Sequence, residues 1–190
     1  MKTKKLLLLL ILIYSSAFSQ EKIDCVIHTT MGDIYMELYP NNAPITVENF
    51  LKYVDNELYN GTTFFRVCTK ENESKRDIQI EVIQGGDVQE DKTYPAIKLE
   101  TTQLTGIRHT HGTVSMARSE PDSATSSFFI CINDQPELDF DGKRNPDGKG
   151  FAAFGKVKEG MHVVKKIQAQ ENENQYLIDT IEIISIEKID

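Results

Sequence analysis

Apolar and polar residues alternate with a period of two along two neighbouring segments early in the chain. Apolar side chains occupy every second position over residues 23–27 and again over residues 34–38, and Met31-Gly32-Asp33 lies between them. Successive side chains of a β-strand point to opposite faces, so an alternating segment buries one face and exposes the other. The two segments therefore predict a β-hairpin that turns at residues 31–33.

The period then changes to that of a helix. Pro44 suits the first position of a helix, where its missing N–H group is not needed. Four apolar residues follow at the spacing of one helical face, and they are Val47, Phe50, Leu51 and Val54. This spacing predicts an amphipathic helix with one buried stripe. A second helix is expected over residues 161–169, and residues 181–186 have the pattern of a closing strand.

The remaining chain consists of short apolar runs separated by Gly, Asn and Asp, with no internal repeat and no low-complexity linker. Many strands with two separated helices favour a mainly β fold, a closed antiparallel β-barrel with helices over its ends. About 170 residues follow the N-terminal leader, which is enough for one domain with a substantial core. We therefore expect a single domain over residues 20–190.

The leader has the three parts of a signal peptide. A lysine-rich start precedes an apolar run over residues 6–13 that is short for a membrane span. Ala17-Phe18-Ser19 then offers small residues before a cleavage site at Gln20. An uncleaved membrane anchor is the alternative. We expect a signal peptide over residues 1–19 and a periplasmic or secreted protein, with no membrane span once the leader is removed.

The chain is acidic, with a formal net charge of −8. Loss of the three leader lysines would lower that charge by three, to −11. Nucleic acid is excluded as a partner class, because its phosphates need a basic surface. The acidic surface mainly favours solubility, and we expect a monomer.

Four short motifs follow one another along the chain. Residues 64–67 read Phe-Phe-Arg-Val, residues 83–87 read Ile-Gln-Gly-Gly-Asp, residues 125–131 read Thr-Ser-Ser-Phe-Phe-Ile-Cys, and residues 154–157 read Phe-Gly-Lys-Val. A lone Phe-Phe-Ile run would be an ordinary buried strand, but the ordered set is specific. From about Lys22 to Ile186 the chain resembles the cyclophilin family of peptidyl-prolyl cis–trans isomerases. The resemblance implies an eight-stranded barrel with two capping helices.

The implied reaction is rotation about the peptide bond that precedes proline. That bond has partial double-bond character, and its rotation barrier is about 18–20 kcal/mol. Uncatalysed exchange takes tens to hundreds of seconds, so reaching milliseconds requires removal of about 6–7 kcal/mol. The twisted amide gains a lone pair on its nitrogen, and a hydrogen-bond donor aimed there stabilises the transition state. No nucleophile, metal ion or cofactor is needed.

Arg66 is the predicted donor, because a guanidinium stays charged and carries several fixed N–H groups. Without the resemblance, an isolated arginine would be expected to form an ion pair at the surface. The resemblance implies a different role, because in the family the arginine of this motif is the principal catalytic residue. Gln84 is the second predicted catalytic residue. Its amide both donates and accepts, so it can hold Arg66 and the substrate backbone together.

The resemblance also implies the residues that bind substrate. Phe129 forms the floor of the proline pocket, while Phe128 points into the core, because neighbours in a strand face opposite ways. Ala117 offers backbone groups to the residue before proline. Three further residues either complete the apolar wall or serve only the core, and they are Val82, Leu138 and Phe151.

Four positions depart from the family pattern. Ser127 replaces a glutamine that binds substrate backbone, Glu137 stands where many members have Trp, and Phe151 stands where many have His. Glu81 falls where an aromatic residue is common, although a polar insertion over residues 69–77, expected to extend a hairpin, leaves that alignment open. We expect a shallower or differently shaped pocket and weak binding of cyclosporin, with turnover retained.

Two segments raise the question of a metal ion. Residues 139–150 are rich in Asp, Asn and Gly, but Lys143 stands at the fifth position of a calcium loop and no Glu stands at the twelfth. A solvated turn is expected there. His109 and His111 have no third ligand nearby, so they are expected to form a solvent-facing pair in a loop rather than a zinc site. We expect no metal ion and no cofactor.

Three cysteines follow the leader, at positions 25, 68 and 131. An odd number without close spacing predicts neither a disulfide framework nor a zinc site. Cys131 is expected to be a buried, small apolar residue. A bridge between Cys25 and Cys68 is possible, and the sequence does not decide it.

Two functions from different classes are compatible with these features. An exported isomerase that acts on proline-containing peptides and unfolded proteins needs Arg66 and Gln84 in one groove. A proline-peptide-binding, chaperone-like module with little or no isomerase activity needs only Phe129 and the groove. A purely structural barrel would need the polar insertion to fill that groove. The isomerase is the preferred interpretation, because the arginine, the glutamine and the phenylalanine are all present.

Overall fold

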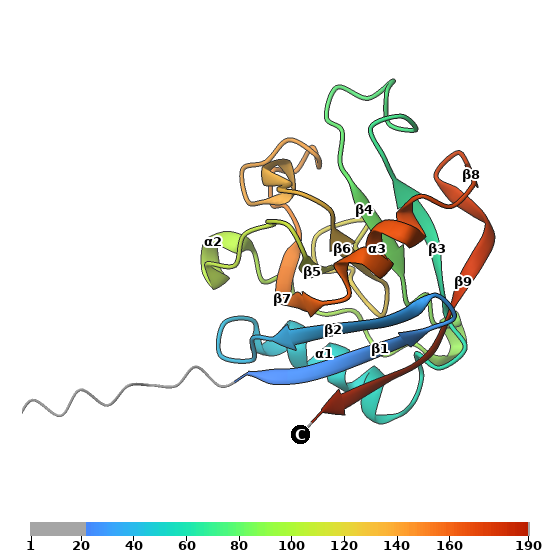
Figure 1. Ribbon diagram of the computed structural model, residues 1–190. Helices are drawn as coiled ribbons and strands as arrows, with labels where there is room; N and C mark the ends of the chain where they lie inside the picture. Colours follow the sequence, from blue (N-terminus) through green and yellow to red (C-terminus); the bar gives the residue numbers. More distant parts are fainter. Residues whose placement is uncertain (1–21, 190) are drawn as a thin grey trace, which may run out of the picture.

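The computed structural model describes residues 22–189, so the predicted signal peptide lies outside the described residues. The strands are β1 Ile23–Thr29, β2 Gly32–Leu38, β3 Thr63–Cys68, β4 Val82–Gly85, β5 Thr113–Met116, β6 Phe128–Cys131, β7 Ala152–Glu159, β8 Asn172–Glu173 and β9 Tyr176–Ile189. Eight of them form an antiparallel sheet in the order β1-β2-β7-β5-β6-β4-β3-β9, and pairing of β1 with β9 closes it into a barrel (Figure 1). The predicted mainly β, closed eight-stranded antiparallel β-barrel is confirmed. The ninth strand, β8, forms a short hairpin with the start of β9.

Strands β1 and β2 form the predicted hairpin. Cys25 faces Met36 and Ile27 faces Ile34 across it, and all four side chains are fully buried. Gly32 has a φ of +126° at the turn, a conformation that residues with a Cβ rarely adopt. Along its other edge β1 pairs with β9, which extends well beyond the predicted closing strand in both directions.

Two helices cap the barrel, as expected. Helix α1, Pro44–Asp55, packs against β7 and β9, and helix α3, Met161–Gln168, packs against β2, β3 and β4. No local side chain caps the start of α1. Instead, the Glu100 carboxylate accepts hydrogen bonds from the N–H groups of Ile45 at 3.2 Å and Thr46 at 2.8 Å. Its negative charge thereby lies at the positive end of the helix dipole.

Three short helical turns are not evident from the sequence pattern, and they are η1 Glu90–Lys92, α2 Thr102–Thr105 and η2 Pro136–Leu138. They are too short to show a helical period. Within residues 22–189 no helix has the length and apolar character that crossing a membrane requires.

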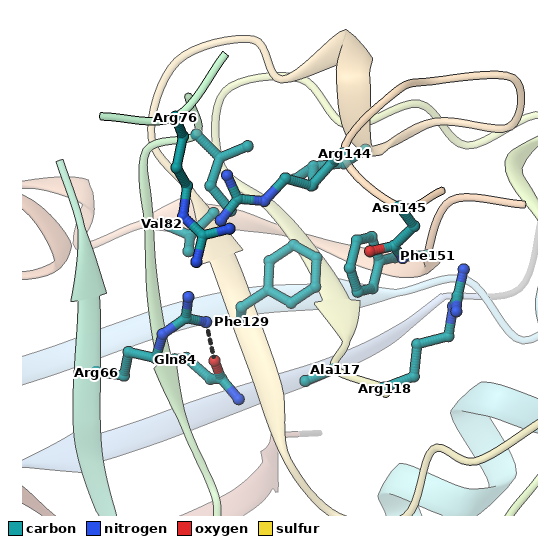
Figure 2. Close-up of a pocket in the computed structure, with 12 residues that line it drawn as sticks. Arg66, Arg76, Val82, Gln84, Ala117, Arg118, Phe129, Arg144, Asn145 and Phe151 are labelled. Carbon is teal, nitrogen blue, oxygen red and sulfur yellow. Dashed lines mark hydrogen bonds between the residues drawn. The ribbon is translucent and has the colours of Figure 1, made fainter. Parts of the chain in front are cut away.

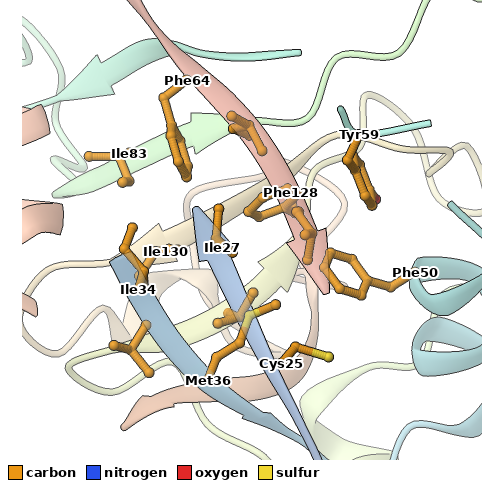
Figure 3. Packing of buried hydrophobic residues seen from close by; sticks show 14 of the residues in the cluster. Cys25, Ile27, Ile34, Met36, Phe50, Tyr59, Phe64, Ile83, Phe128 and Ile130 are labelled. Carbon is orange, nitrogen blue, oxygen red and sulfur yellow. The ribbon is translucent and has the colours of Figure 1, made fainter. Parts of the chain in front are cut away.

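An aromatic and aliphatic cluster fills the inside of the barrel (Figure 3). The rings of Phe50 and Phe64 both meet the ring of Phe128 edge-on, with centroids 5.5 and 5.9 Å apart. Such pairs add about 0.5–1.5 kcal/mol each beyond the area that they bury. Gly86 has a φ of +74°, and a Cβ there would lie 2.6 Å from the Phe128 ring. The glycines of the Gln-Gly-Gly-Asp motif thus let the core rings pack directly on the backbone.

All three cysteines are free, buried thiols. Cys25 lies in the cluster inside the barrel, whereas Cys68 and Cys131 lie in a second apolar cluster on its outer face. The Cys25–Cys68 bridge that the sequence left open is therefore not formed, and Cys131 is buried as predicted. Burial raises the pKa of Cys68 to about 11 and that of Cys25 to about 12. Both thiols stay protonated at neutral pH and are poor nucleophiles.

Candidate active site

A bulge in β3 turns Arg66 to the outside of the barrel. In a regular strand Phe64 and Arg66 would share a face, and Phe64 is fully buried in the core. Against β4 the register shifts between these two residues, and Phe65 is the extra residue of the bulge. Against β9 the register shifts at the same place, where Phe65 faces residues 177–180. Regular alternation resumes with Val67 in the inner cluster and Cys68 in the outer one. Arg66 consequently lies on the outer face, on the same side as Cys68.

Arg66 begins a row of directly paired residues that crosses four strands. Arg66 on β3 pairs with Gln84 on β4, Gln84 pairs with Phe129 on β6, and Phe129 pairs with Ser115 on β5. Phe128 lies in the inner cluster and Phe129 in the outer one, as predicted. Arg66 Nη1 donates a hydrogen bond of 2.8 Å to Gln84 Oε1 (Figure 2). Motifs that are far apart in the sequence therefore meet side by side on one face.

A pocket of about 260 Å³ lies over this row (Figure 2). All seven predicted site residues line it, and they are Arg66, Val82, Gln84, Ala117, Phe129, Leu138 and Phe151. Phe129 is 5% exposed, and the Phe151 ring meets it edge-on with centroids 5.3 Å apart. The Ala117 N–H is already bonded to the Ser127 carbonyl at 2.9 Å, so its carbonyl is the backbone group that it can offer. The structure brings the predicted residues together, and their individual roles stay predictions.

The departures from the family pattern have local explanations. Phe151 lines the pocket, and Ile80 and Val82 line it on either side of Glu81, which does not. Ser127 Oγ accepts a 3.2 Å hydrogen bond from Gln84 Nε2. Arg66 can only donate, so it fixes the Gln84 oxygen toward itself, and Ser127 accepts from the nitrogen at the other end of the amide. Ser127 thus supports the site instead of leaving a gap.

The expected solvent-facing position of His109 is wrong. Its ring is buried and stacks on Phe129, with centroids 5.9 Å apart. Nδ1–H donates to Asp139 at 2.8 Å, because a carboxylate can only accept, and Nε2 accepts from the Ser115 hydroxyl at 2.9 Å. Burial lowers the pKa of His109, and the opposing effect of Asp139 does not restore it. A neutral imidazole therefore supports the pocket floor from below.

The expected solvated turn over residues 139–150 is confirmed only in part: Asp141, Lys143, Pro146, Asp147 and Lys149 are exposed, but the segment also forms a wall of the pocket. Asp139 is buried, and Arg144 and Asn145 line the pocket directly. Gly150 has a φ of +64°, and a Cβ there would lie 2.5 Å from the Asp139 carbonyl group. The Asp, Asn and Gly residues thus allow a tightly folded loop with internal hydrogen bonds. Residues that are typical of an exposed turn here let the backbone pack closely against itself.

The polar insertion folds back toward the pocket through Glu73. This side chain has no exposed surface, and both of its oxygens accept hydrogen bonds from the Arg144 guanidinium. The Ile80 N–H donates to it at 3.2 Å, and Arg76 Nε lies 3.3 Å away. Burial alone would raise the pKa of Glu73, but the hydrogen bonds and charge of Arg144 lower it below the ordinary value. A buried carboxylate therefore anchors the insertion to the pocket wall.

Sequence reasoning missed five pocket residues, which are Arg76, Ile80, Arg118, Arg144 and Asn145. A signal was present, because only five of the 21 basic residues are arginines, and four of those five line the pocket. A guanidinium pairs with carboxylates through a planar fork that lysine lacks. The scarcity of arginine could therefore have marked these positions as sites of fixed pairing.

The pocket is positively charged although the chain is acidic. Arg118 lies over the Phe151 ring, 5.2 Å from its centroid, and forms two hydrogen bonds of 2.8 and 2.9 Å with Asp147. The four pocket guanidinium groups are balanced by two carboxylates, Glu73 and Asp147. Among residues 22–189 there is no cluster of three or more His, Cys, Asp or Glu side chains suited to a metal ion. The site thus offers cationic hydrogen-bond donors beside an apolar floor.

Comparison with known proteins places the chain. Residues 25–188 match the family described as "Cyclophilin type peptidyl-prolyl cis-trans isomerase/CLD". Peptidyl-prolyl cis-trans isomerase A of Dickeya dadantii is 41% identical over 167 residues, covering 85% of this chain and 80% of that relative. A peptidyl-prolyl cis-trans isomerase of Acinetobacter baylyi is 44% identical over 144 residues, covering 73% and 68%.

A solved structure supports the fold. The crystal structure of a cyclophilin-type peptidyl-prolyl cis-trans isomerase of Cryptosporidium parvum superposes with a TM-score of 0.72 at 22% identity, covering 90% of this chain and 99% of that one. A second structure of the same protein, in the presence of the dipeptide Ala-Pro, has a TM-score of 0.69 at 23% identity, covering 86% and 96%. The chain belongs to the cyclophilin-type peptidyl-prolyl cis–trans isomerases, enzymes that accelerate rotation about the bond before proline.

Proposed function

We propose that the pocket over Phe129 is where this isomerase binds proline, and that Arg66 is its catalytic residue. The proline ring packs on Phe129, with Phe151 and Leu138 as walls. Arg66 donates a hydrogen bond to the nitrogen of the twisted amide, and Gln84 orients both the guanidinium and the substrate backbone. The planar ground state has no free lone pair on that nitrogen, so this bond favours the transition state over the bound substrate.

One observation carries the proposal: Arg66, Gln84 and Phe129 are register partners on three adjacent strands of the outer face. A module that only binds proline segments would need the floor without the cation beside it. The test of Arg66 as the catalytic residue is the isomerisation rate of a short Ala-Pro peptide. It is measured without protein, with wild type, and with the Arg66→Ala and Arg66→Lys variants. Competition by free Ala-Pro dipeptide reports whether the peptide occupies the Phe129 pocket.

The charge of the pocket also favours a class of substrate. Arg76 has a side chain that is 56% exposed, and the carboxylate nearest to it, Glu73, already forms two hydrogen bonds with Arg144. Figure 2 shows the Arg76 guanidinium pointing into the pocket above Val82, on the same side as Arg66. The positive charge of Arg76 is therefore only partly neutralised, and a carboxylate of the substrate beside its proline could pair with it. We therefore propose a preference for proline segments that carry Asp or Glu beside the proline.

We expect an acetylated tetrapeptide with Glu beside proline to be isomerised about 2–5-fold more efficiently than its Gln counterpart, the range of a partly exposed ion pair. Arg76→Ala should bring the two rates together, and so should 1 M salt, which shortens the Debye length to about 3 Å. The matched control is Arg108→Ala, because Arg108 is the arginine outside the pocket. A Glu-to-Gln ratio that Arg76→Ala leaves unchanged would contradict this preference.

We further propose that the protein acts outside the cytoplasm, on exported proteins whose folding waits for proline isomerisation. The three-part leader supports export. The mature protein is then expected to begin near Gln20. N-terminal sequencing of the protein purified from its native source checks this, and an intact Met1 would count against export by a cleaved signal peptide.

A further inference from the structure

Arg66 has a second partner besides Gln84, and it comes from the opposite side. Gln175 Oε1 accepts hydrogen bonds from Arg66 Nε at 3.0 Å and from Arg66 Nη2 at 2.6 Å. With the Nη1 bond to Gln84, three of the five guanidinium N–H groups are engaged. The two that remain are one on Nη1 and one on Nη2. Gln175 and Gln84 thus hold the guanidinium from both sides and fix the plane in which its remaining donors lie.

The Gln175 amide is itself oriented. Its Nε2 donates to Glu73 Oε1 at 2.6 Å, and that carboxylate is held by Arg144. A carboxylate only accepts, so the NH₂ end of the amide must face Glu73 and the oxygen must face Arg66. A flipped amide would place N–H groups against the guanidinium and an oxygen against the carboxylate. The buried charge of Glu73 therefore determines which atom Arg66 meets.

The backbone of Gln175 supplies an independent indication. Asn174 and Gln175 are the central residues of the tight turn between β8 and β9, with φ of +51° and +78°. Both positions of such a turn favour Gly or Asn, because a Cβ is strained at positive φ. Glutamine is a poor choice for this turn on backbone grounds alone. The presence of a strained residue at this point is consistent with a use for its side chain.

We propose that Gln175 is a positioning residue for catalysis, which sets the plane and direction of the Arg66 guanidinium and is itself oriented by Glu73. This inference rests on the proposed role of Arg66 and adds to it the residues that prepare the guanidinium before substrate binds. A donor that is already aimed need not be reorganised when the amide twists, which is the condition for efficient electrostatic catalysis.

The test uses Gln175→Gly, which removes the side chain and suits the left-handed backbone. We expect a folded protein with a thermal midpoint close to that of wild type, and a kcat/KM lower by about tenfold, mainly through kcat. Gln175→Asn, which also tolerates the turn but is one methylene shorter, should lose activity as well. The matched control is Asn172→Ala in the same hairpin, because Asn172 bonds to Asn72 and not to Arg66. Wild-type kcat in Gln175→Gly would overturn the proposal.

A second readout does not depend on turnover. The chain has five arginines, so it gives five Nε–H signals in a ¹H–¹⁵N spectrum, and the signal missing from Arg66→Ala belongs to Arg66. That signal should be protected from solvent exchange in wild type and in Asn172→Ala, and should lose protection in Gln175→Gly. Unchanged protection would overturn the positioning role.

A double-mutant cycle separates positioning from a general effect on the fold. Gln175→Gly should cost activity in the wild-type background and nothing further in the Arg66→Ala background, because the two residues act as a unit. Equal losses in both backgrounds would contradict the proposal. If Arg66→Ala keeps wild-type activity, the role of Arg66 fails, whereas a deficient Arg66→Ala with a fully active Gln175→Gly refutes only the role of Gln175.

Discussion

Replacing Arg66 by alanine is expected to lower kcat/KM for a proline peptide by about 30- to 1000-fold while the barrel stays folded. The loss corresponds to about 2–4 kcal/mol, the range for removing one preorganised donor from a partly dry site. Because the nitrogen lone pair exists only in the twisted amide, kcat should fall and the affinity for the peptide should change little. The measurement is the isomerisation rate of an Ala-Pro peptide, with folding checked by circular dichroism.

Two further variants make the Arg66 result specific. Arg66→Lys should recover little, because an ammonium on a flexible stem cannot donate simultaneously to Gln84 and Gln175 in the geometry of the planar fork. Arg108→Ala removes a guanidinium of which 78% of the side chain is exposed, and it should leave the rate unchanged. Equal rates for wild type and a folded Arg66→Ala would remove Arg66 from the mechanism.

Replacing Glu73 by alanine is expected to have the largest effect on stability. The substitution leaves the Arg144 guanidinium, with only 9% of its side chain exposed, without the carboxylate that neutralises it. Breaking a buried ion pair by removing one partner costs about 3–5 kcal/mol. For a chain of this size that corresponds to a thermal midpoint lower by about 6–20 °C. Activity should also fall, because the Gln175 amide loses the contact that orients it.

The dependence on pH checks the origin of the Glu73 effect. The folded-state pKa of Glu73 lies below its ordinary value of 4.5, so its contribution is present above that pH and is lost as the pH falls through the folded pKa. The stability difference between wild type and Glu73→Ala should therefore shrink on acidification below pH 4.5. Glu71→Ala, an exposed carboxylate of the same insertion, serves as the control. A difference that persists unchanged in acid would show that packing, not charge, is responsible.

The fold could be predicted wherever a buried face repeats locally. The β1–β2 hairpin, α1 and α3 each carry a period of two or 3.6 in their own residues, so the sequence located them. A closed barrel could be expected from the number of strands and from the motif resemblance, but no local pattern identifies the pairing of β1 with β9 that closes it. The row from Arg66 to Phe129 likewise needs a bulge at Phe65 that no glycine or proline announces.

The parts of the site that the sequence did not reveal depend on distant partners. His109 is separated from Asp139 by 30 positions, and Arg66 is separated from Gln175 by 109. A polar residue in a polar segment is usually solvated, and only the folded chain shows that these residues are buried or held. The same reason explains the wall formed by residues 139–150, whose composition is that of an exposed turn. A local sequence pattern can predict that an apolar side chain is buried. It cannot predict that a polar side chain is buried through a hydrogen bond to a residue far away in the sequence.

Closure of the barrel by β9 has a consequence for the order of events during synthesis. Strand β9 pairs with β1 along one edge and with β3 along the other, and it begins directly after Gln175. A growing chain that has reached only residue 170 therefore carries all four motifs but has neither a closed barrel nor the second partner of Arg66. Contacts between segments so far apart in the chain also make folding slow relative to local structure. The barrel of a growing chain of this topology therefore stays open until β9 has been synthesised, which is later than the point at which its catalytic motifs are complete.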